Sequence, residues 1–208
     1  MDRATAGHPG LSLGAREARI AAALCRRFAG LPLAIELAAA RLGQLSLAEV
    51  ASQVEERIDA IGGSRSVDAR HRTMRASLEW SYEMLDESER VSLRRLSVFA
   101  GGFSREAAHA VVAGIEPFPE PGAIVGTHGR LVDKSMLIAE PGPEGTGYRL
   151  LEIVRQFAAE RLEAAGETLS TRTRHAAWYH DLVPEARTWA GPDQQLWMDR
   201  LRRETDNV

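Results

Sequence analysis

The sequence predicts a mainly α-helical protein, in which a helical subdomain precedes a winged helix-turn-helix with a small β-hairpin. Two observations predict this class. Apolar residues recur three or four residues apart through most of the chain, which is the spacing of one helical face. The pattern changes near residues 136–150, where short apolar runs flank a stretch rich in Gly and Pro, as in a hairpin. Several small helices followed by a hairpin is the order of a winged helix.

The first expected feature is a sharp corner between two helices. Residues 15–28 form a helix in this interpretation, because Ile20, Leu24 and Phe28 lie four residues apart on one face. Gly30 ends that helix. Pro32 suits the first turn of the next one, because proline has a fixed φ and no N–H that a helix would need there.

The next signals are a cap and a linker. Ser46 and Glu49 have the S-x-x-E spacing of a capping box, which predicts a helix over about residues 47–58. Residues 59–71 contain several Gly and Ser and are predicted to be a linker. From Thr73 a new helix is expected, whose shared face consists of Met74, Leu78, Tyr82 and Leu85.

The following stretch carries the signals of the winged helix. Asp86 is placed to cap a helix that ends at Gly101–Gly102, and Ser104 to cap a short helix over residues 105–112. A helix or turn is expected around residues 124–133. The strand candidates are residues 136–140 and 148–150, and a closing helix covers residues 151–165.

The corner also carries a family resemblance. Gly30-Leu31-Pro32-Leu33, followed by the run AIELAAARL, resembles the GLPL motif of the NB-ARC group of signalling ATPases, the STAND class. That class includes bacterial regulators of the AfsR and LuxR-like kind. The resemblance implies that Gly30, Leu31, Pro32 and Leu33 form a cofactor-binding corner, with the proline packed on the adenine of ADP.

A second part of the chain is similar to the winged-helix subdomain of the same ATPases. The similar stretches are residues 70–82, 96–103, 131–135 and 148–152. The sequence departs from the family twice. Leu150-Leu151-Glu152 stands where many members have Met-His-Asp, and the phosphate loop G-x-x-x-x-G-K-[ST] is absent from the sequence. The resemblance therefore implies a module that is not an enzyme and binds no ADP or ATP by itself.

The expected domain organisation follows from these stretches. Residues 1–14 are predicted to be a disordered N-terminus, residues 15–62 a helical GLPL subdomain and residues 66–166 a winged-helix subdomain. Residues 168–208 contain two helical patterns separated near Gly191–Pro192. By resemblance to the family, they begin an α-helical repeat domain of tetratricopeptide-like kind.

Composition excludes several classes of function. The net charge is −3, from 26 basic and 29 acidic residues. The chain therefore has no overall positive field that would attract nucleic acid or an anionic membrane. Cys25 is the single cysteine, so neither an intrachain disulfide nor a zinc site of several thiolates can form. The histidines lack the usual spacing of metal ligands. We expect no metal site, no membrane partner and a cytoplasmic location.

Two functions remain open at this point. By resemblance, the chain is a non-catalytic regulatory module that helps to hold ADP against an upstream nucleotide-binding domain, intramolecular or on a separate chain. It would relay a signal from the repeat domain, with homo-oligomerisation on activation left open. The alternative is a stand-alone DNA-binding winged-helix transcription regulator. Its candidate recognition helix offers only His128, Arg130 and Lys134 among apolar residues, which does not favour DNA contact by this segment.

Overall fold

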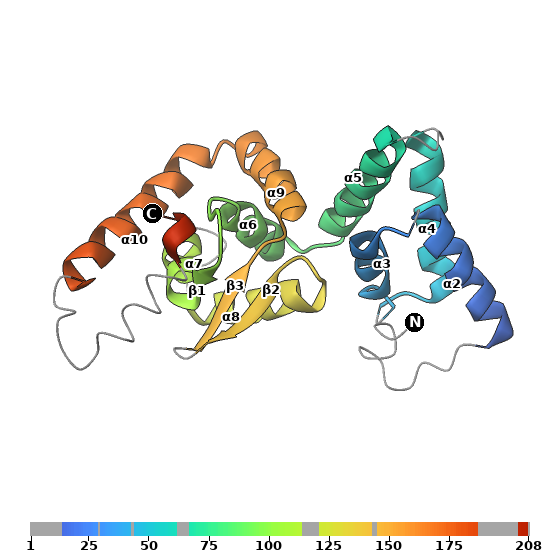
Figure 1. Cartoon of the computed structure of the whole chain (residues 1–208), viewed down its shortest axis with the longest axis horizontal. Helices are drawn as coiled ribbons and strands as arrows, with labels where there is room; N and C mark the ends of the chain where they lie inside the picture. The colour runs from blue at the N-terminus through green and yellow to red at the C-terminus, as the bar shows by residue number, and fades with distance from the viewer. Residues whose placement is uncertain are drawn as a thin grey trace. The chain divides into compact units, whose positions relative to one another are not determined.

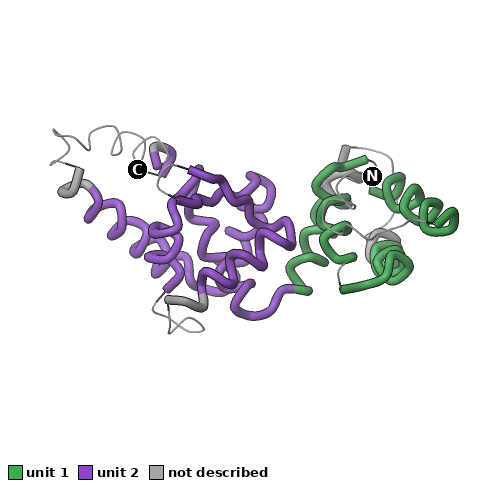
Figure 2. The backbone as a smooth tube through the Cα atoms, turned by 90° about the horizontal axis from the view of Figure 1, so that it is seen from below, with its two compact units in different colours: residues 1–84 green, residues 85–208 purple. Residues whose placement is uncertain are grey.

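The computed structural model describes residues 14–28, 30–42, 44–61, 67–113, 121–142, 145–186 and 204–207. The chain divides into two units, residues 1–84 and residues 85–208 (Figure 2). The predicted disordered N-terminus lies almost wholly outside the described residues. So does the second helical pattern predicted after Gly191–Pro192.

The regular secondary structure in the described part of the first unit is entirely α-helical (Figure 1). Its helices are α2 (Ala15–Arg27), α3 (Pro32–Ala39), α4 (Leu47–Ile61) and α5 (Val67–Glu83). Helix α2 packs on α4, and both α3 and α4 pack on α5. The core between them contains Leu24, Phe28, Leu33, Leu37, Val50, Val54, Leu78 and Trp80.

Local sequence signals predicted two features of this unit correctly. Gly30 has a φ of +70°, the left-handed conformation that glycine adopts without strain, and Pro32 is the first residue of α3. The capping box is also present: the Glu49 N–H donates to Ser46 Oγ at 3.3 Å, and the Ser46 N–H donates to Glu49 Oε2 at 2.7 Å.

The helix ends beside the predicted linker are different from the prediction. Helix α4 continues to Ile61, and α5 begins at Val67, so all of the residues in 59–71 that the structure describes are helical. The chain from Val67 to Glu83 contains no Gly or Pro, and the helix extends over this whole stretch. Residues 62–66 lie outside the described part.

Helix α5 is grouped with the first unit, although the sequence placed it at the start of the winged-helix subdomain. Trp80 is buried, and its Nε1 donates to Gln53 Oε1 at 2.9 Å. Arg41 is fully buried and donates to the Ser81 carbonyl at 2.9 Å. Both contacts join residues far apart in sequence, so helical periodicity could not reveal them.

The second unit contains the predicted winged helix-turn-helix. In chain order it has α6 (Glu87–Leu96), β1 (Phe103–Ser104), α7 (Arg105–Val112), α8 (Pro121–Asp133), β2 (Ile138–Gly142), β3 (Gly145–Arg149), α9 (Glu152–Ala164), α10 (Thr168–Ala186) and a 3₁₀ turn η1 (Thr205–Asn207). The sheet is antiparallel in the order β1-β3-β2. The fold class is therefore confirmed.

Several details of this unit differ from the prediction. The hairpin strands are Ile138–Gly142 and Gly145–Arg149, where residues 136–140 and 148–150 were expected. Helix α6 ends at Leu96, several residues before Gly101–Gly102. The two-residue strand β1 was not predicted; it pairs Phe103 with Tyr148, and the Phe103 ring stacks on Phe99 with centroids 4.1 Å apart. A strand of two residues is too short to show an alternating pattern, and β1 is recognisable only by its pairing with the distant strand β3.

No helix in the described part of the chain is long and apolar enough to span a membrane. The same residues contain no group of three or more His, Cys, Asp or Glu that could hold a metal ion.

Candidate functional site

Helix α8 precedes the hairpin and is the candidate recognition helix of the winged helix. The inner face of this helix is buried and contains both apolar and polar residues, namely Ile124, Thr127, His128 and Leu131. From residue 124 on, where burial is described, the exposed face consists of Val125, Gly126, Gly129, Arg130 and Asp133. A partner would therefore meet a surface composed largely of small and apolar residues.

Both cations of the α8 region are neutralised by α6. The Glu89 side chain is fully buried, and its two carboxylate oxygens accept from Lys134 Nζ at 2.7 and 2.6 Å. Arg130 Nε donates to the same carboxylate at 3.0 Å, and Arg130 Nη2 reaches Asp86 Oδ2 at 3.3 Å. Since Asp86 and Glu89 also form the capping box of α6, one carboxylate pair fixes both helices.

The third basic residue of this region is held uncharged inside the unit. His128 Nε2 lies 3.0 Å from Ser92 Oγ, and its ring meets the Tyr148 ring edge-on. Burial, assisted by the nearby His109, lowers the pKa of His128 to about 4. The imidazole is therefore neutral near pH 7 and unavailable to a phosphate.

The hairpin and the start of α9 also carry paired charges. Arg149 of β3 forms an ion pair with Glu140 of β2. Glu152 accepts from Arg155 Nε and Nη2 at 2.8 and 2.7 Å and from Gln156 at 2.7 Å, and these bonds lower its pKa to about 2. The Leu150-Leu151-Glu152 sequence thus places a carboxylate in a local ion pair.

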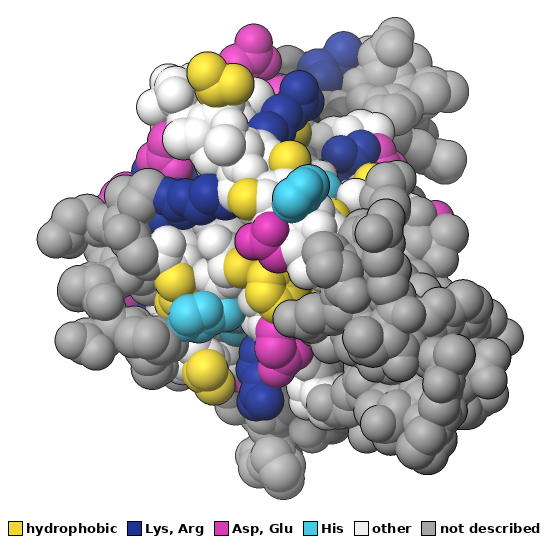
Figure 3. All heavy atoms as spheres, turned by 90° about the vertical axis from the view of Figure 1, so that its left-hand side faces the viewer, with side chains coloured by type: hydrophobic (Ala, Val, Ile, Leu, Met, Phe, Trp, Pro, Cys, Tyr) yellow, Lys and Arg dark blue, Asp and Glu magenta, His cyan; other side chains and the backbone are white. Residues whose placement is uncertain are grey.

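The surface view is consistent with scattered charge. On the face shown in Figure 3, the Lys and Arg side chains of the described residues lie in separate groups between acidic, apolar and uncharged ones. A continuous basic stripe is the usual footprint of a duplex-binding surface.

The predicted cofactor corner lies in the first unit. Gly30 and Pro32 are exposed, Leu31 is partly buried at the N-cap of α3, and Leu33 belongs to the core. A Cβ atom at Gly30 would meet nothing within 4 Å. The proline ring therefore lies at the surface of the corner, while Leu33 anchors the corner to the unit.

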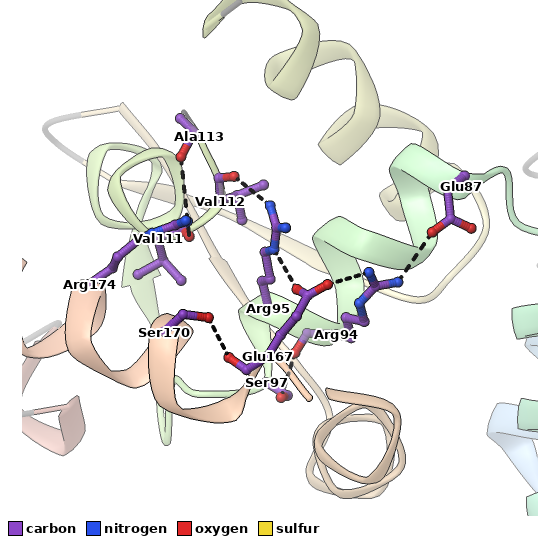
Figure 4. Close-up of polar contacts among 10 residues, drawn as sticks. All are labelled: Glu87, Arg94, Arg95, Ser97, Val111, Val112, Ala113, Glu167, Ser170 and Arg174. Carbon is purple, nitrogen blue, oxygen red and sulfur yellow. Dashed lines mark hydrogen bonds and ion pairs between the residues drawn. The ribbon is translucent and has the colours of Figure 1, made fainter. Parts of the chain in front are cut away.

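Sequence reasoning missed a polar network around α7 (Figure 4). Glu167 Oε1 accepts from Arg94 Nη2 at 2.5 Å, and Glu167 Oε2 accepts from Arg95 Nε at 2.8 Å. Arg95 Nη1 also donates to the Val112 carbonyl at 3.1 Å, and Arg174 Nη1 donates to the Val111 carbonyl at 2.8 Å. Two arginines thus satisfy carbonyls at the C-terminus of α7, where the helix dipole favours cations.

Comparison with known proteins agrees with this architecture. Residues 85–163 match the family model described as a winged helix-turn-helix domain. The whole chain is 38% identical over 210 aligned residues to a Mycobacterium tuberculosis protein named "Putative HTH-type transcriptional regulator" and to one of the same name from Mycobacterium bovis. It is also 39% identical over 176 residues to an uncharacterized protein of M. tuberculosis.

The chain spans only part of the length of these relatives. It covers 23% of the length of the two regulators and 44% of the uncharacterized protein. The matches support a winged-helix transcription regulator better than the predicted module of an NB-ARC ATPase.

Proposed function

We propose that this chain acts as a winged-helix segment of a helix-turn-helix transcriptional regulator. The observation that carries the proposal is the winged-helix domain at residues 85–163, together with the similarity of this chain to a segment of proteins named as HTH-type transcriptional regulators. Because the chain spans about a quarter of the length of those relatives, we propose for it the role of one domain of a regulator and not the function of the whole protein.

The geometry of α8 favours contact with protein over reading of DNA. Base readout needs side-chain donors and acceptors at the groove, and Arg and Lys side chains are the charged donors to phosphate. Here Arg130 and Lys134 pair with Glu89, and the rest of the exposed face is Val, Gly and Asp. In this proposal α8 packs against another domain or chain of the regulator.

Fluorescence anisotropy of the chain with a labelled duplex tests this point. We expect weak binding at low salt and a shallow salt dependence, because each neutralised phosphate adds about 0.9 to the slope of log K against log salt. Arg130→Ala should leave the titration unchanged. Tight binding that falls steeply with salt and is weakened by Arg130→Ala would instead identify α8 as a DNA-reading helix.

A second, finer proposal concerns the corner Gly30–Leu33. By its family resemblance, we infer that it contributes an adenine-contacting wall to ADP held by an upstream nucleotide-binding domain. The exposed Pro32 at the start of α3 supports this, because its ring is free to stack on a flat apolar ligand.

Calorimetric titration of ADP into a full-length regulator carrying this segment tests the second proposal. Pro32→Ala should weaken ADP binding several-fold, because the ring contact is lost. Glu55→Ala, an exposed position on α4, is the matched control. Equal ADP affinities of the Pro32 variant and the parent would contradict the role of the corner.

A further inference from the structure

The last described residues return to a loop about a hundred positions earlier in the chain. Asn207 is buried, and its Oδ1 accepts from the Ala100 N–H at 2.8 Å and from the Gly101 N–H at 3.2 Å. Its Nδ2 donates to the Gly102 carbonyl at 2.7 Å. A single side-chain amide therefore satisfies three backbone groups of the loop between α6 and β1.

Glu204 makes the second attachment. Its side chain is buried, Oε1 accepts from the Ser104 N–H at 2.8 Å, and Oε2 accepts from the Tyr179 hydroxyl and from Asn207 Nδ2. Ser104 is the N-cap of α7, so the carboxylate lies at the positive end of that helix. The helix dipole and three donors compensate for burying the charge.

The loop that contacts residues 204–207 has no room for a side chain at position 101. A Cβ atom at Gly101 would lie 2.6 Å from Asp206 Oδ2 and 2.7 Å from Asp206 Cβ, well inside van der Waals contact. Glu204 and Asn207 are three residues apart, and in a 3₁₀ turn residues at that spacing lie on one side. The loop therefore fits a single turn with a polar residue at each end.

We propose that the loop Ala100–Ser104 and Tyr179 form a binding site for a Glu-x-x-Asn turn, and that the chain's own residues 204–207 occupy it as a latch. The latch fixes residues 204–207 to the winged-helix domain. Its release would expose three loop backbone groups and the N-terminus of α7. This inference does not depend on the proposed function, because it uses only contacts within the second unit.

Amide hydrogen exchange in the full chain, followed by NMR, tests the latch. Asn207→Ala should accelerate exchange at the Ala100 and Gly101 amides by at least about tenfold, because their acceptor is lost. Asp206→Ala is the matched control, since that side chain is exposed and its removal should change these rates less than about twofold. Unchanged exchange in the Asn207 variant would overturn the proposal.

A second pair of variants separates the latch from damage to the loop. Gly101→Ala should accelerate exchange at Ala100 as strongly as Asn207→Ala, because the new methyl group collides with Asp206. Adding Asp206→Gly removes the collision and should restore slow exchange. If the double variant exchanges as fast as Gly101→Ala, the collision with Asp206 is not what accelerates exchange, so the turn does not lie against Gly101 as proposed and the proposal fails.

Discussion

At the scale of single residues, His128 shows how burial sets a charge state. Its ring is buried, one nitrogen faces Ser92, and Nδ1 has no hydrogen-bond partner among the residues that the structure describes. The unfolded imidazole titrates near pH 6.5, whereas in the fold the pKa is about 4. Between these values the unfolded chain binds a proton that the folded chain excludes, so acid favours unfolding.

We therefore predict a specific pH dependence of stability. The free energy of unfolding should fall as the pH drops from about 6.5 to about 4, by up to roughly 3 kcal/mol from this residue. Urea titrations at a series of pH values, followed by tryptophan fluorescence, measure this free energy. His128→Gln should flatten the profile in part, because the lowered pKa of His175 acts in the same direction. The exposed His180→Gln is the control, and an unchanged profile in the His128 variant would contradict the assignment.

The basic residues of α8 also show what a sequence can and cannot predict. From the sequence a helix or turn is expected around residues 124–133, and the structure has a helix with Ile124, His128 and Leu131 on its buried face. The capture of Arg130 and Lys134 by Glu89 is not predictable, because the carboxylate lies 41 and 45 positions away. Only the packing of α6 on α8 brings these charges together.

At the scale of elements, the last carbonyl groups of α7 accept hydrogen bonds from side chains of other helices. Arg95 of α6 and Arg174 of α10 contact its last carbonyls, and Glu167 holds Arg95 in place. Burial alone would raise the pKa of Glu167, but the hydrogen bonds from Arg94 and Arg95 outweigh it and lower the pKa. The bridge therefore stabilises the fold above the ordinary carboxyl pKa and weakens as the pH falls through the lowered value.

Removing Glu167 should be costly, because it deletes a carboxylate that pairs with the buried Arg95 at 2.8 Å. We predict that Glu167→Ala lowers the free energy of unfolding by about 3 kcal/mol. Glu87→Ala is the matched control: Glu87 also pairs with Arg94, but at 3.4 Å and with a side chain 65% exposed, so the loss should stay below about 1 kcal/mol. Denaturant titrations compare them, and equal losses would show that burial of the bridge does not matter.

The elements predicted best are those with signals in their own sequence. The caps at Ser46, Asp86 and Ser104 and the glycine at position 30 all lie where the structure has helix ends. The elements predicted poorly depend on distant partners. Strand β1 exists only through its pairing with β3, and the latch at Glu204 and Asn207 joins positions a hundred residues apart.

At the scale of the whole molecule, the two units have separate cores. The first is centred on Leu37, Leu78 and Trp80, and the second on Leu93, Phe103 and Leu131. The domain limits proposed from sequence stay predictions. Helix α5 packs on α3 and α4, and the contact of its Trp80 with Gln53 lies within the first unit.

Separate cores lead to a prediction about cooperativity. Scanning calorimetry of the full chain should resolve two transitions, one for each unit. Trp80→Phe removes the hydrogen bond to Gln53 and some buried volume, about 1–3 kcal/mol, and should lower only one midpoint, by roughly 4–8 °C per kcal/mol. Glu167→Ala should lower only the other, because its partners all lie in the second unit. A single transition that both variants shift alike would mean that the units unfold as one cooperative body.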